Sequence, residues 1–276
     1  MSDKPNISSR KRLRFVPAAA LLTALFVSGC APEEESENEN PPADEENTEN
    51  ENEEEMEEEA GSPDTPSSYG VSAGHPDAVE AGMEVLDQGG NAADAAVAAA
   101  YAVSVVEPFA SGIGGGGSVL IQEQGEAPEA YDYREVVPET GIPSSDIGVP
   151  GFTAGMAAFQ SNHGTADWSD LLEPAVTLAD SSEVSGLLAD QLESGAGSLP
   201  TAELRHLYSN GVPLEAGSTM EQAELADTLR DIRDNGGGGF YEGEAAESLA
   251  SQIEGLDTAS LEAFEVGRYE PSIGTF

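Results

Sequence analysis

The clearest hydrophobic pattern begins just after residue 74, where apolar residues recur at helical spacing. Val79, Met83 and Leu86 are three or four positions apart, so they share one face of a helix. Pro76 suits the first turn of that helix, because proline lacks the N–H that a first turn leaves unbonded. The pair Gly89-Gly90 ends the pattern. The sequence therefore predicts an amphipathic helix that begins at Pro76 and ends before these glycines.

Residues 92–106 consist almost wholly of small apolar side chains, with Asp94 and Ser104 as polar exceptions. Asn91 can cap a helix over this segment, and Asp94 stands at the position of a reciprocal capping box. The pair Glu107-Pro108 ends it, because the residue before a proline avoids helical geometry. The pattern predicts a second helix that is buried nearly all round.

A glycine run at residues 112–117 precedes two strand patterns. The run lacks the lysine of a P-loop and leads into a strand, so it does not indicate a phosphate site. Residues 118–122 and 129–136 have strand composition, and the loop at 125–128 separates them. This arrangement predicts a hairpin.

Beyond residue 150 the apolar positions return mostly to helical spacing. The spacing predicts helices at residues 151–160, 167–180, 187–192, 202–207, 222–234 and 244–253. Short strands are expected at residues 71–73 and from residue 269 onward. The chain should therefore mix strands with a larger share of helix.

The first residues have the composition of an export signal. Basic residues up to Arg14 precede an apolar run that ends at Val27, which is too short to span a bilayer comfortably. The sequence Val27-Ser28-Gly29-Cys30 resembles a bacterial lipobox, whose cysteine is acylated. We therefore expect a lipoprotein signal peptide at residues 1–29 and an exported protein held to the lipid bilayer through Cys30. An ordinary signal peptide with an incidental cysteine is the alternative.

Residues 30–65 are rich in Glu, Asn, Asp and Pro and contain almost nothing apolar. Such a segment cannot bury a core, so it predicts an acidic disordered tether. A calcium-binding tract is the alternative interpretation of its acidic run. The folded part is expected at residues 66–276.

The charge of the chain is extreme. It has 53 acidic and 10 basic residues, which give a formal net charge of -43 at pH 7. Such a chain repels phosphate backbones, which argues against nucleic acid as a partner. Dense carboxylates with scarce lysine favour a protein bathed in high salt, where screening weakens the repulsion among them. An acidic secreted protein from ordinary conditions is the alternative. The single cysteine excludes an intrachain disulfide.

Several motifs, in one order, resemble the γ-glutamyltranspeptidase family. They are His75-Pro76-Asp77-Ala78, Gly89-Gly90-Asn91-Ala92-Ala93-Asp94-Ala95, Val105-Val106-Glu107-Pro108, the glycine-rich segment 111–117, Asp132-Tyr133-Arg134-Glu135, Gly148-Val149-Pro150-Gly151 and Phe240-Tyr241-Glu242-Gly243. The resemblance covers about residues 69–276 and corresponds to the N-terminal, large-subunit part of the family.

This resemblance implies an α/β (α+β) fold of the N-terminal-nucleophile hydrolase type, an α/β/β/α sandwich of which the chain holds a helix-rich, incomplete portion. Such proenzymes cleave themselves before a threonine, whose hydroxyl then attacks the γ-glutamyl amide. Water or an amino acid takes the γ-glutamyl group, and no metal or organic cofactor is required. Glutathione, other γ-glutamyl peptides and poly-γ-glutamate remain open as substrates.

The resemblance assigns one substrate-binding residue in this chain, Arg134. It corresponds to the arginine that binds the α-carboxylate of the γ-glutamyl group. A guanidinium suits that role because it can donate two parallel hydrogen bonds to a carboxylate. A structural ion pair between Arg134 and Asp132 or Glu135 is the alternative.

The catalytic residues of the family have no counterpart in this chain. The threonines that match large-subunit segments, and so are not the nucleophile, are Thr153, Thr165, Thr177, Thr219, Thr228 and Thr275. The chain alone is therefore expected to be inactive and to need a small subunit as its partner. Unpaired strand edges should also make residues 66–276 alone poorly soluble. A non-enzymatic surface lipoprotein, a binding module or an inactive relic of the enzyme are the alternatives.

The three histidines, His75, His163 and His206, are scattered without metal-ligand spacing. We expect no metal site, and we expect His75 to be structural.

Overall fold

The structure, a computed structural model, describes residues 68–143 and 147–274. The expected signal peptide, Cys30 and the acidic tether lie outside these residues. The first described helix, α1 (Pro76–Asp87), is capped by His75, whose Nδ1 accepts the N–H of Asp77 at 3.2 Å. The prediction for this helix is confirmed.

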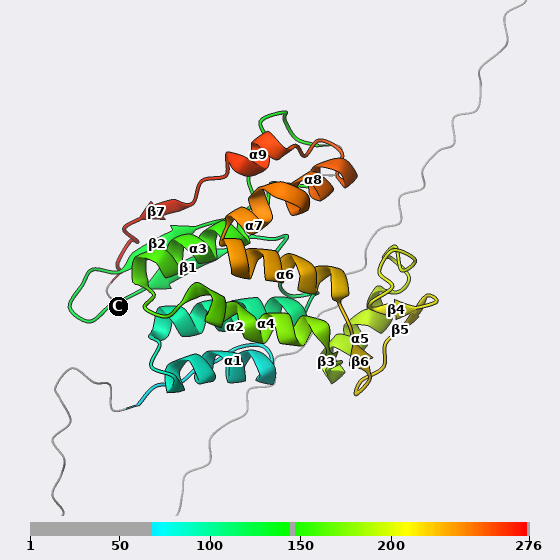
Figure 1. The fold of residues 1–276 in the computed structure, drawn as a ribbon, viewed down its shortest axis with the longest axis horizontal. Helices are drawn as coiled ribbons and strands as arrows, with labels where there is room; N and C mark the ends of the chain where they lie inside the picture. Colours follow the sequence, from blue (N-terminus) through cyan, green and yellow to red (C-terminus); the bar gives the residue numbers. More distant parts are fainter. Residues whose placement is uncertain (1–67, 144–146, 275–276) are drawn as a thin grey trace, which may run out of the picture. The chain divides into compact units, whose positions relative to one another are not determined.

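Helix α2 (Ala92–Val106) has the predicted bounds, and both bonds of the Asn91–Asp94 capping box are present. It packs against α1 and against α4 (Trp168–Asp180), and α4 in turn packs against α6 (Ala223–Asn235) (Figure 1). The many alanines of α2 allow its close approach to α1 and α4. The α2 helix is therefore the buried centre of a helical layer.

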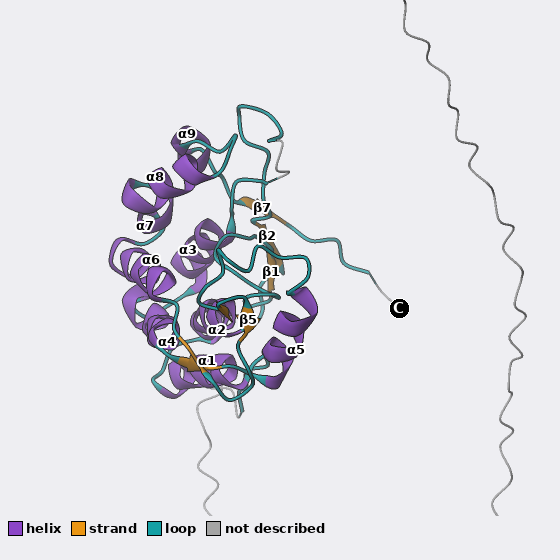
Figure 2. Cartoon of the chain, turned by 90° about the vertical axis from the view of Figure 1, so that its right-hand side faces the viewer, coloured by secondary structure: helices purple, strands orange, loops and turns teal. Residues whose placement is uncertain are grey.

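A three-stranded antiparallel sheet lies on one side of the helices (Figure 2). Its order is β1 (Ser118–Ile121), β2 (Glu129–Asp132) and β7 (Gly267–Tyr269). The predicted hairpin is confirmed by the antiparallel pairing of β1 with β2. Helix α3 (Phe152–His163) covers the inner face, where the buried Tyr131 contacts Phe159 edge to face. The sheet is thus anchored through one face.

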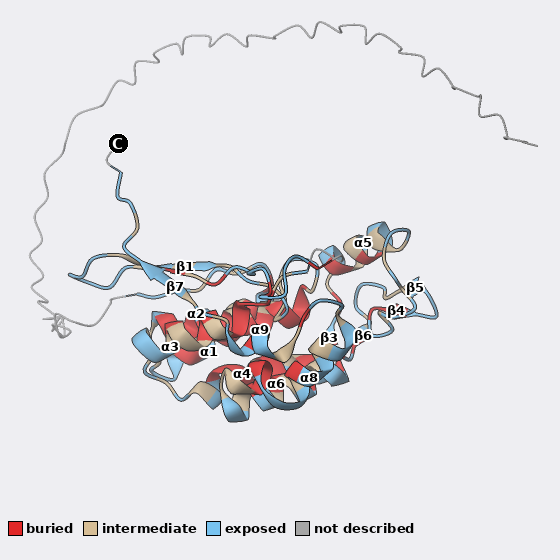
Figure 3. Cartoon of the chain, turned by 90° about the horizontal axis from the view of Figure 1, so that it is seen from above, coloured by how far each residue is buried: buried red, intermediate tan, exposed pale blue. Residues whose placement is uncertain are grey.

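The opposite face of the sheet is open: β7 is exposed along its whole length, and β1 alternates between exposed and half-buried residues (Figure 3). The register places Leu120, Ala130 and Tyr269 in one cross-strand row. Leu120 is 68% exposed and Tyr269 is 50% exposed. Large apolar side chains of a folded protein usually lie inside, so this row indicates a surface that another layer can cover.

A smaller lobe surrounds α5 (Gly186–Gly195). Two short antiparallel pairs accompany this helix, β3 (Ser182–Glu183) with β6 (Thr219–Met220) and β4 (Tyr208–Ser209) with β5 (Val212–Pro213). They enclose a separate apolar cluster whose buried members are Val184, Leu188, Leu192, Leu207, Tyr208 and Met220. The remaining helices are α7 (Gly238–Tyr241), α8 (Gly243–Gln252) and α9 (Thr258–Glu262).

Four sequence predictions are wrong in detail. The strand expected from residue 269 onward instead ends at Tyr269, as the last residue of β7. Residues 71–73 form no strand, and residues 202–207 form turns rather than a helix. The turns lead into the β4–β5 hairpin, whose loop Asn210-Gly211 has φ of 53° and 81°, values that favour strand reversal. The strand expected at residues 129–136 ends at Asp132, although Val136 forms an isolated bridge with Val149. That early end determines where Arg134 lies.

Candidate functional site

The segment that carries Arg134 leaves the sheet directly after β2. Tyr133 still exchanges backbone hydrogen bonds with Gly117, at 2.9 and 3.4 Å. The backbone N–H of Arg134 instead donates to Asp132 Oδ1 at 3.1 Å. A short polar side chain that accepts a hydrogen bond from the backbone N–H two residues later stabilises a turn. Arg134 therefore stands on a turn at the end of a strand, rather than on the strand itself.

Three glycines pack against this turn, and we call them the glycine collar: Gly116, Gly151 and Gly155. A Cβ atom at Gly116 would lie 2.8 Å from Arg134 Cα. A Cβ atom at Gly151 would lie 2.8 Å from the carbonyl carbon of Tyr133, and one at Gly155 would lie 2.6 Å from Tyr133 Cβ. No side chain fits at these distances, so the collar explains why the sequence has glycine at these positions.

Helix α7 braces the collar through Tyr241. Its hydroxyl donates to the carbonyl of Pro150 at 2.8 Å and accepts the N–H of Ala154 at 3.2 Å. The Tyr241 ring stacks on Phe264 with centroids 6.1 Å apart. Burial raises the pKa of Tyr241 to about 12, although the hydrogen bond from Ala154 acts in the opposite direction. Tyr241 therefore connects two motifs that are far apart in the sequence, 148–151 and 240–243.

The Arg134 guanidinium itself is largely free. Its side chain is 74% exposed, and its Nε lies 3.8 Å from Asp132 Oδ1. Its terminal nitrogens form no hydrogen bond with any described residue. By contrast, Arg230 and Arg233 form ion pairs at 2.6–2.8 Å. Arg134 can therefore donate to an incoming carboxylate without first breaking a tight ion pair.

The remaining residues singled out in the sequence are dispersed. His75 caps α1 as described, and His206 lies in the turns before β4, where burial lowers its pKa although Glu224 acts to raise it. Thr153 is buried in α3, and Thr165 donates both its N–H and its hydroxyl to Asp94. Thr153 is therefore inaccessible, and the hydroxyl of the exposed Thr165 is engaged with a structural carboxylate.

A polar network surrounds His163, and it was not predicted from the sequence. His163 Nδ1 lies 2.5 Å from Glu123 Oε1, and its Nε2 lies 2.8 Å from the Tyr131 hydroxyl. Arg268 of β7 pairs with both carboxylate oxygens of Glu129 and holds the pKa of that carboxyl below its usual range. These partners come from distant segments, so no spacing in the sequence could have indicated the network. It ties β7 to the hairpin and to α3.

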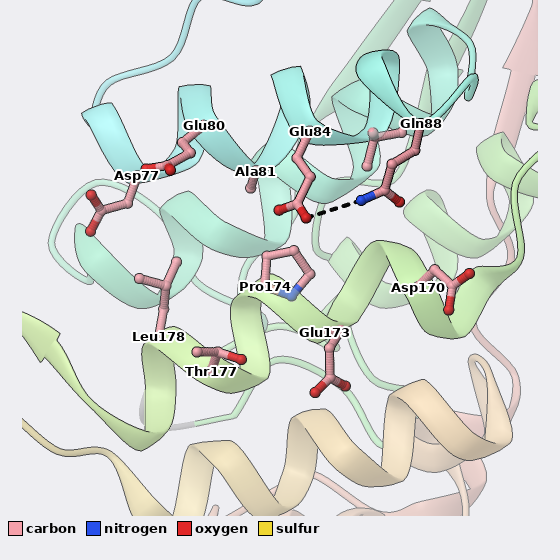
Figure 4. A pocket seen from close by; sticks show the side chains of 11 residues that line it. Asp77, Glu80, Ala81, Glu84, Gln88, Asp170, Glu173, Pro174, Thr177 and Leu178 are labelled. Atoms are coloured by element: carbon pink, nitrogen blue, oxygen red, sulfur yellow. Dashed lines mark hydrogen bonds between the residues drawn. The ribbon is translucent and has the colours of Figure 1, made fainter.

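The groove between α1 and α4 is acidic and does not involve the Arg134 turn (Figure 4). It has a volume of about 610 Å³, and five carboxylates line it, those of Asp77, Glu80, Glu84, Asp170 and Glu173. Glu173 is paired with Arg233 at 2.8 Å. Like charges repel, so this groove does not suit a substrate carboxylate.

Within 68–143 and 147–274, no three or more His, Cys, Asp or Glu side chains converge as metal ligands. Over the same residues, no helix combines the length and apolar composition that crossing a membrane requires.

Comparison with known proteins gives consistent results. The sequence model of the family described as γ-glutamyltranspeptidase matches residues 78–275. The capsule biosynthesis protein CapD proenzyme of Bacillus anthracis is 40% identical over 211 residues, which are 76% of this chain and 40% of that protein. The glutathione hydrolase proenzyme of Escherichia coli (strain K12) is 34% identical over 258 residues, covering 79% of this chain and 44% of that protein. The chain thus spans less than half the length of these two relatives.

The fold agrees with a solved structure as well. The crystal structure of Helicobacter pylori γ-glutamyltranspeptidase superposes with a TM-score of 0.71 at 30% identity, covering 78% of this chain and 69% of that chain. The expected N-terminal-nucleophile hydrolase-like fold is therefore confirmed.

Proposed function

The chain belongs to the γ-glutamyltranspeptidase family, and from this premise we propose that it is the portion of a γ-glutamyltransferase or glutathione hydrolase that binds the γ-glutamyl group of the substrate. In this proposal Arg134 binds the α-carboxylate of that group. The observation that carries the assignment is the exposed guanidinium on a tightly packed turn, whose terminal N–H donors form no hydrogen bond within residues 68–143 and 147–274. Substrate binding gains when the binding group is positioned in advance, because less freedom is lost.

The ion-pair alternative for Arg134 is less well supported. Its contact with Asp132 is at 3.8 Å and involves Nε, and the Asp132 side chain is itself 37% exposed. Exposed ion pairs of this kind contribute little to stability. Asp132 instead bonds the backbone of Arg134, which supports the turn and leaves the outer edge of the guanidinium for substrate.

The catalytic nucleophile in this proposal is a threonine outside the 276 residues of the chain, on a small subunit. The open apolar row of Leu120, Ala130 and Tyr269 supports such a partner, because the family fold is a sandwich in which a second sheet covers the first. We propose that the second sheet packs on this row. The substrate class is γ-glutamyl peptides such as glutathione, for which the relative from Escherichia coli is named.

The cellular location is also a proposal. The lipobox at Cys30 and the basic and apolar segment before it support export and acylation, and the acidic segment 30–65 supports a tether that holds the folded part away from the bilayer. The test is incorporation of radiolabelled palmitate, with Cys30→Ala as the negative control. If the wild-type protein incorporates no more label than this variant, the proposed location loses its support.

The activity experiment compares variants of this chain, each combined with the proposed small subunit. We expect release of glutamate from glutathione, and we expect Arg134→Ala to raise KM by about 100-fold or more, because two charge-assisted hydrogen bonds to the carboxylate are lost. Arg134→Lys should recover part of the loss, since lysine keeps the charge but not the paired geometry.

The matched control is Arg205→Ala. Arg205 is exposed, and its Nε donates to the carbonyl of Ala202 at 3.2 Å. This variant removes the same charge outside the site and should leave KM unchanged. Equal KM values for wild type and Arg134→Ala would refute the assignment. Absence of γ-glutamyl hydrolysis and transfer when the chain is combined with the proposed small subunit would refute the proposed activity.

A further inference from the structure

A second cavity lies where the first turn of α1, the end of α2 and the start of α5 meet. Its volume is about 500 Å³. Three carboxylates line it, those of Asp77, Glu107 and Glu183, and its lining contains no arginine or lysine. A recess with charges of one sign and poorly polarisable walls concentrates the electrostatic potential. The cavity therefore favours a cation.

Glu107 distinguishes this cavity from the acidic surface elsewhere. The residue is 3% exposed. Its Oε1 accepts a hydrogen bond from the Ser185 hydroxyl at 2.9 Å, whereas its Oε2 is buried and has no hydrogen-bond partner among the described residues. A buried carboxylate oxygen without a donor is unfavourable, because its lost hydration is not replaced. A ligand that brings an N–H donor would supply the missing bond.

His75 is the remaining titratable residue of the lining. Its Nδ1 accepts the backbone N–H of Asp77 at 3.2 Å and lies 3.7 Å from Asp77 Oδ2. The lining thus combines three carboxylates with one imidazole that already serves as the cap of α1.

The chemistry of the lining selects the type of cation. Calcium needs six or more oxygen ligands, and magnesium needs a near-ideal octahedron of ligands. Within the described part of the chain, no set of three acidic or histidine side chains converges in that way. A primary ammonium needs three acceptors and tolerates apolar surface beside its carbon chain, which Pro76 and Leu187 provide here. We propose that this cavity binds the primary ammonium group of a small organic amine, with Glu107 Oε2 as its buried acceptor.

The test is calorimetric titration of the full chain with n-butylammonium chloride at low ionic strength. Tetramethylammonium chloride is the charge-matched comparison, because it has the same charge and no N–H donor. We expect one butylammonium per chain, bound about tenfold or more tightly than tetramethylammonium. Equal affinity for the two cations would mean general attraction to an acidic protein, and would overturn the proposal.

Two variants test the site itself. Glu107→Gln should weaken butylammonium binding by about tenfold or more, while its amide oxygen can still accept from Ser185. Glu203→Gln removes the same charge at an exposed position outside the cavity and should bind as the wild type does. Unchanged affinity in Glu107→Gln would overturn the proposal.

If Glu107→Gln fails to fold by circular dichroism, Glu183→Gln decides the question. It removes an exposed carboxylate from the same lining, so it should bind butylammonium several-fold more weakly than Glu203→Gln does. Equal affinity of those two variants would overturn the proposal. Neither outcome depends on γ-glutamyl chemistry.

Discussion

The substitution Tyr241→Phe removes one oxygen atom from the brace behind the glycine collar. That oxygen accepts the N–H of Ala154, the third residue of α3, whose N-cap residue Gly151 has no side chain to do so. It also donates to the carbonyl of Pro150. Tyr241 therefore caps α3 from another helix while it holds the loop before α3 in place.

The two lost hydrogen bonds set the magnitude of the destabilisation. Removal of a helix cap costs about 1 kcal/mol. A buried carbonyl left without its donor costs about 1–3 kcal/mol. The phenyl ring keeps its place beside Phe240 and Phe264, so the apolar packing is retained. We expect Tyr241→Phe to lower the free energy of unfolding by about 2–4 kcal/mol.

The assay is urea unfolding of the full chain followed by circular dichroism. With a slope of about 2 kcal/mol per molar urea, the midpoint should fall by about 1–2 M. Tyr269→Phe removes the same atom from a half-exposed tyrosine and should change stability by less than about 0.5 kcal/mol. If Tyr241→Phe is no less stable than Tyr269→Phe, the bracing role is wrong.

Three further predictions use other contacts. Burial acts to raise the pKa of the Asp94 carboxyl, but hydrogen bonds from Asn91, Thr165 and Ala166 outweigh it and hold that pKa below its usual value. The stability that Asp94 contributes is therefore present above about pH 4 and is lost as the pH falls through its folded pKa. Asp94→Ala should cost about 3–5 kcal/mol at neutral pH and flatten the acid limb of a pH–stability curve, whereas Asp190→Asn, at an exposed site, should do neither. Gly155→Ala should destabilise the protein by about 1–3 kcal/mol or more, because its Cβ would overlap Tyr133. The control Gly186→Ala, with open space around the new Cβ, should be neutral or slightly stabilising, and thermal melts of the two variants test the difference. Molar NaCl should raise the melting temperature if the dense carboxylates reflect a high-salt habitat, and a flat response would contradict that origin.

Local signals in the sequence were sufficient for α1 and α2. Pro76, the Asn91–Asp94 capping box and the paired glycines act within one or two helical turns, so they operate whatever the rest of the chain does. The same reasoning failed for residues 202–207, where a weak helical pattern competes with the hairpin turn Asn210-Gly211. That dipeptide is a strong hairpin signal and could have corrected the prediction.

Arg134 shows the limit of a motif. Its resemblance to the family motif placed it in the candidate site, yet the strand on which the sequence pattern located it ends at Asp132. The turn exists because glycines approach it from two separate segments, Gly116 from the glycine-rich run and Gly151 and Gly155 from the start of α3, and none of them is adjacent to Arg134 in the sequence. Its role in binding substrate stays a prediction.

The amino-acid sequence by itself determined the helical start and stop signals, the extreme acidity and the membership of the family, because these depend on residues near one another or on their order along the chain. The tertiary structure alone decided the glycine collar, the Tyr241 brace, the His163 network and the burial of Glu107. The pairing of Arg268 with Glu129 joins residues 139 positions apart. Contacts of that kind depend on how the elements pack, and packing is set by the whole chain rather than by any local pattern.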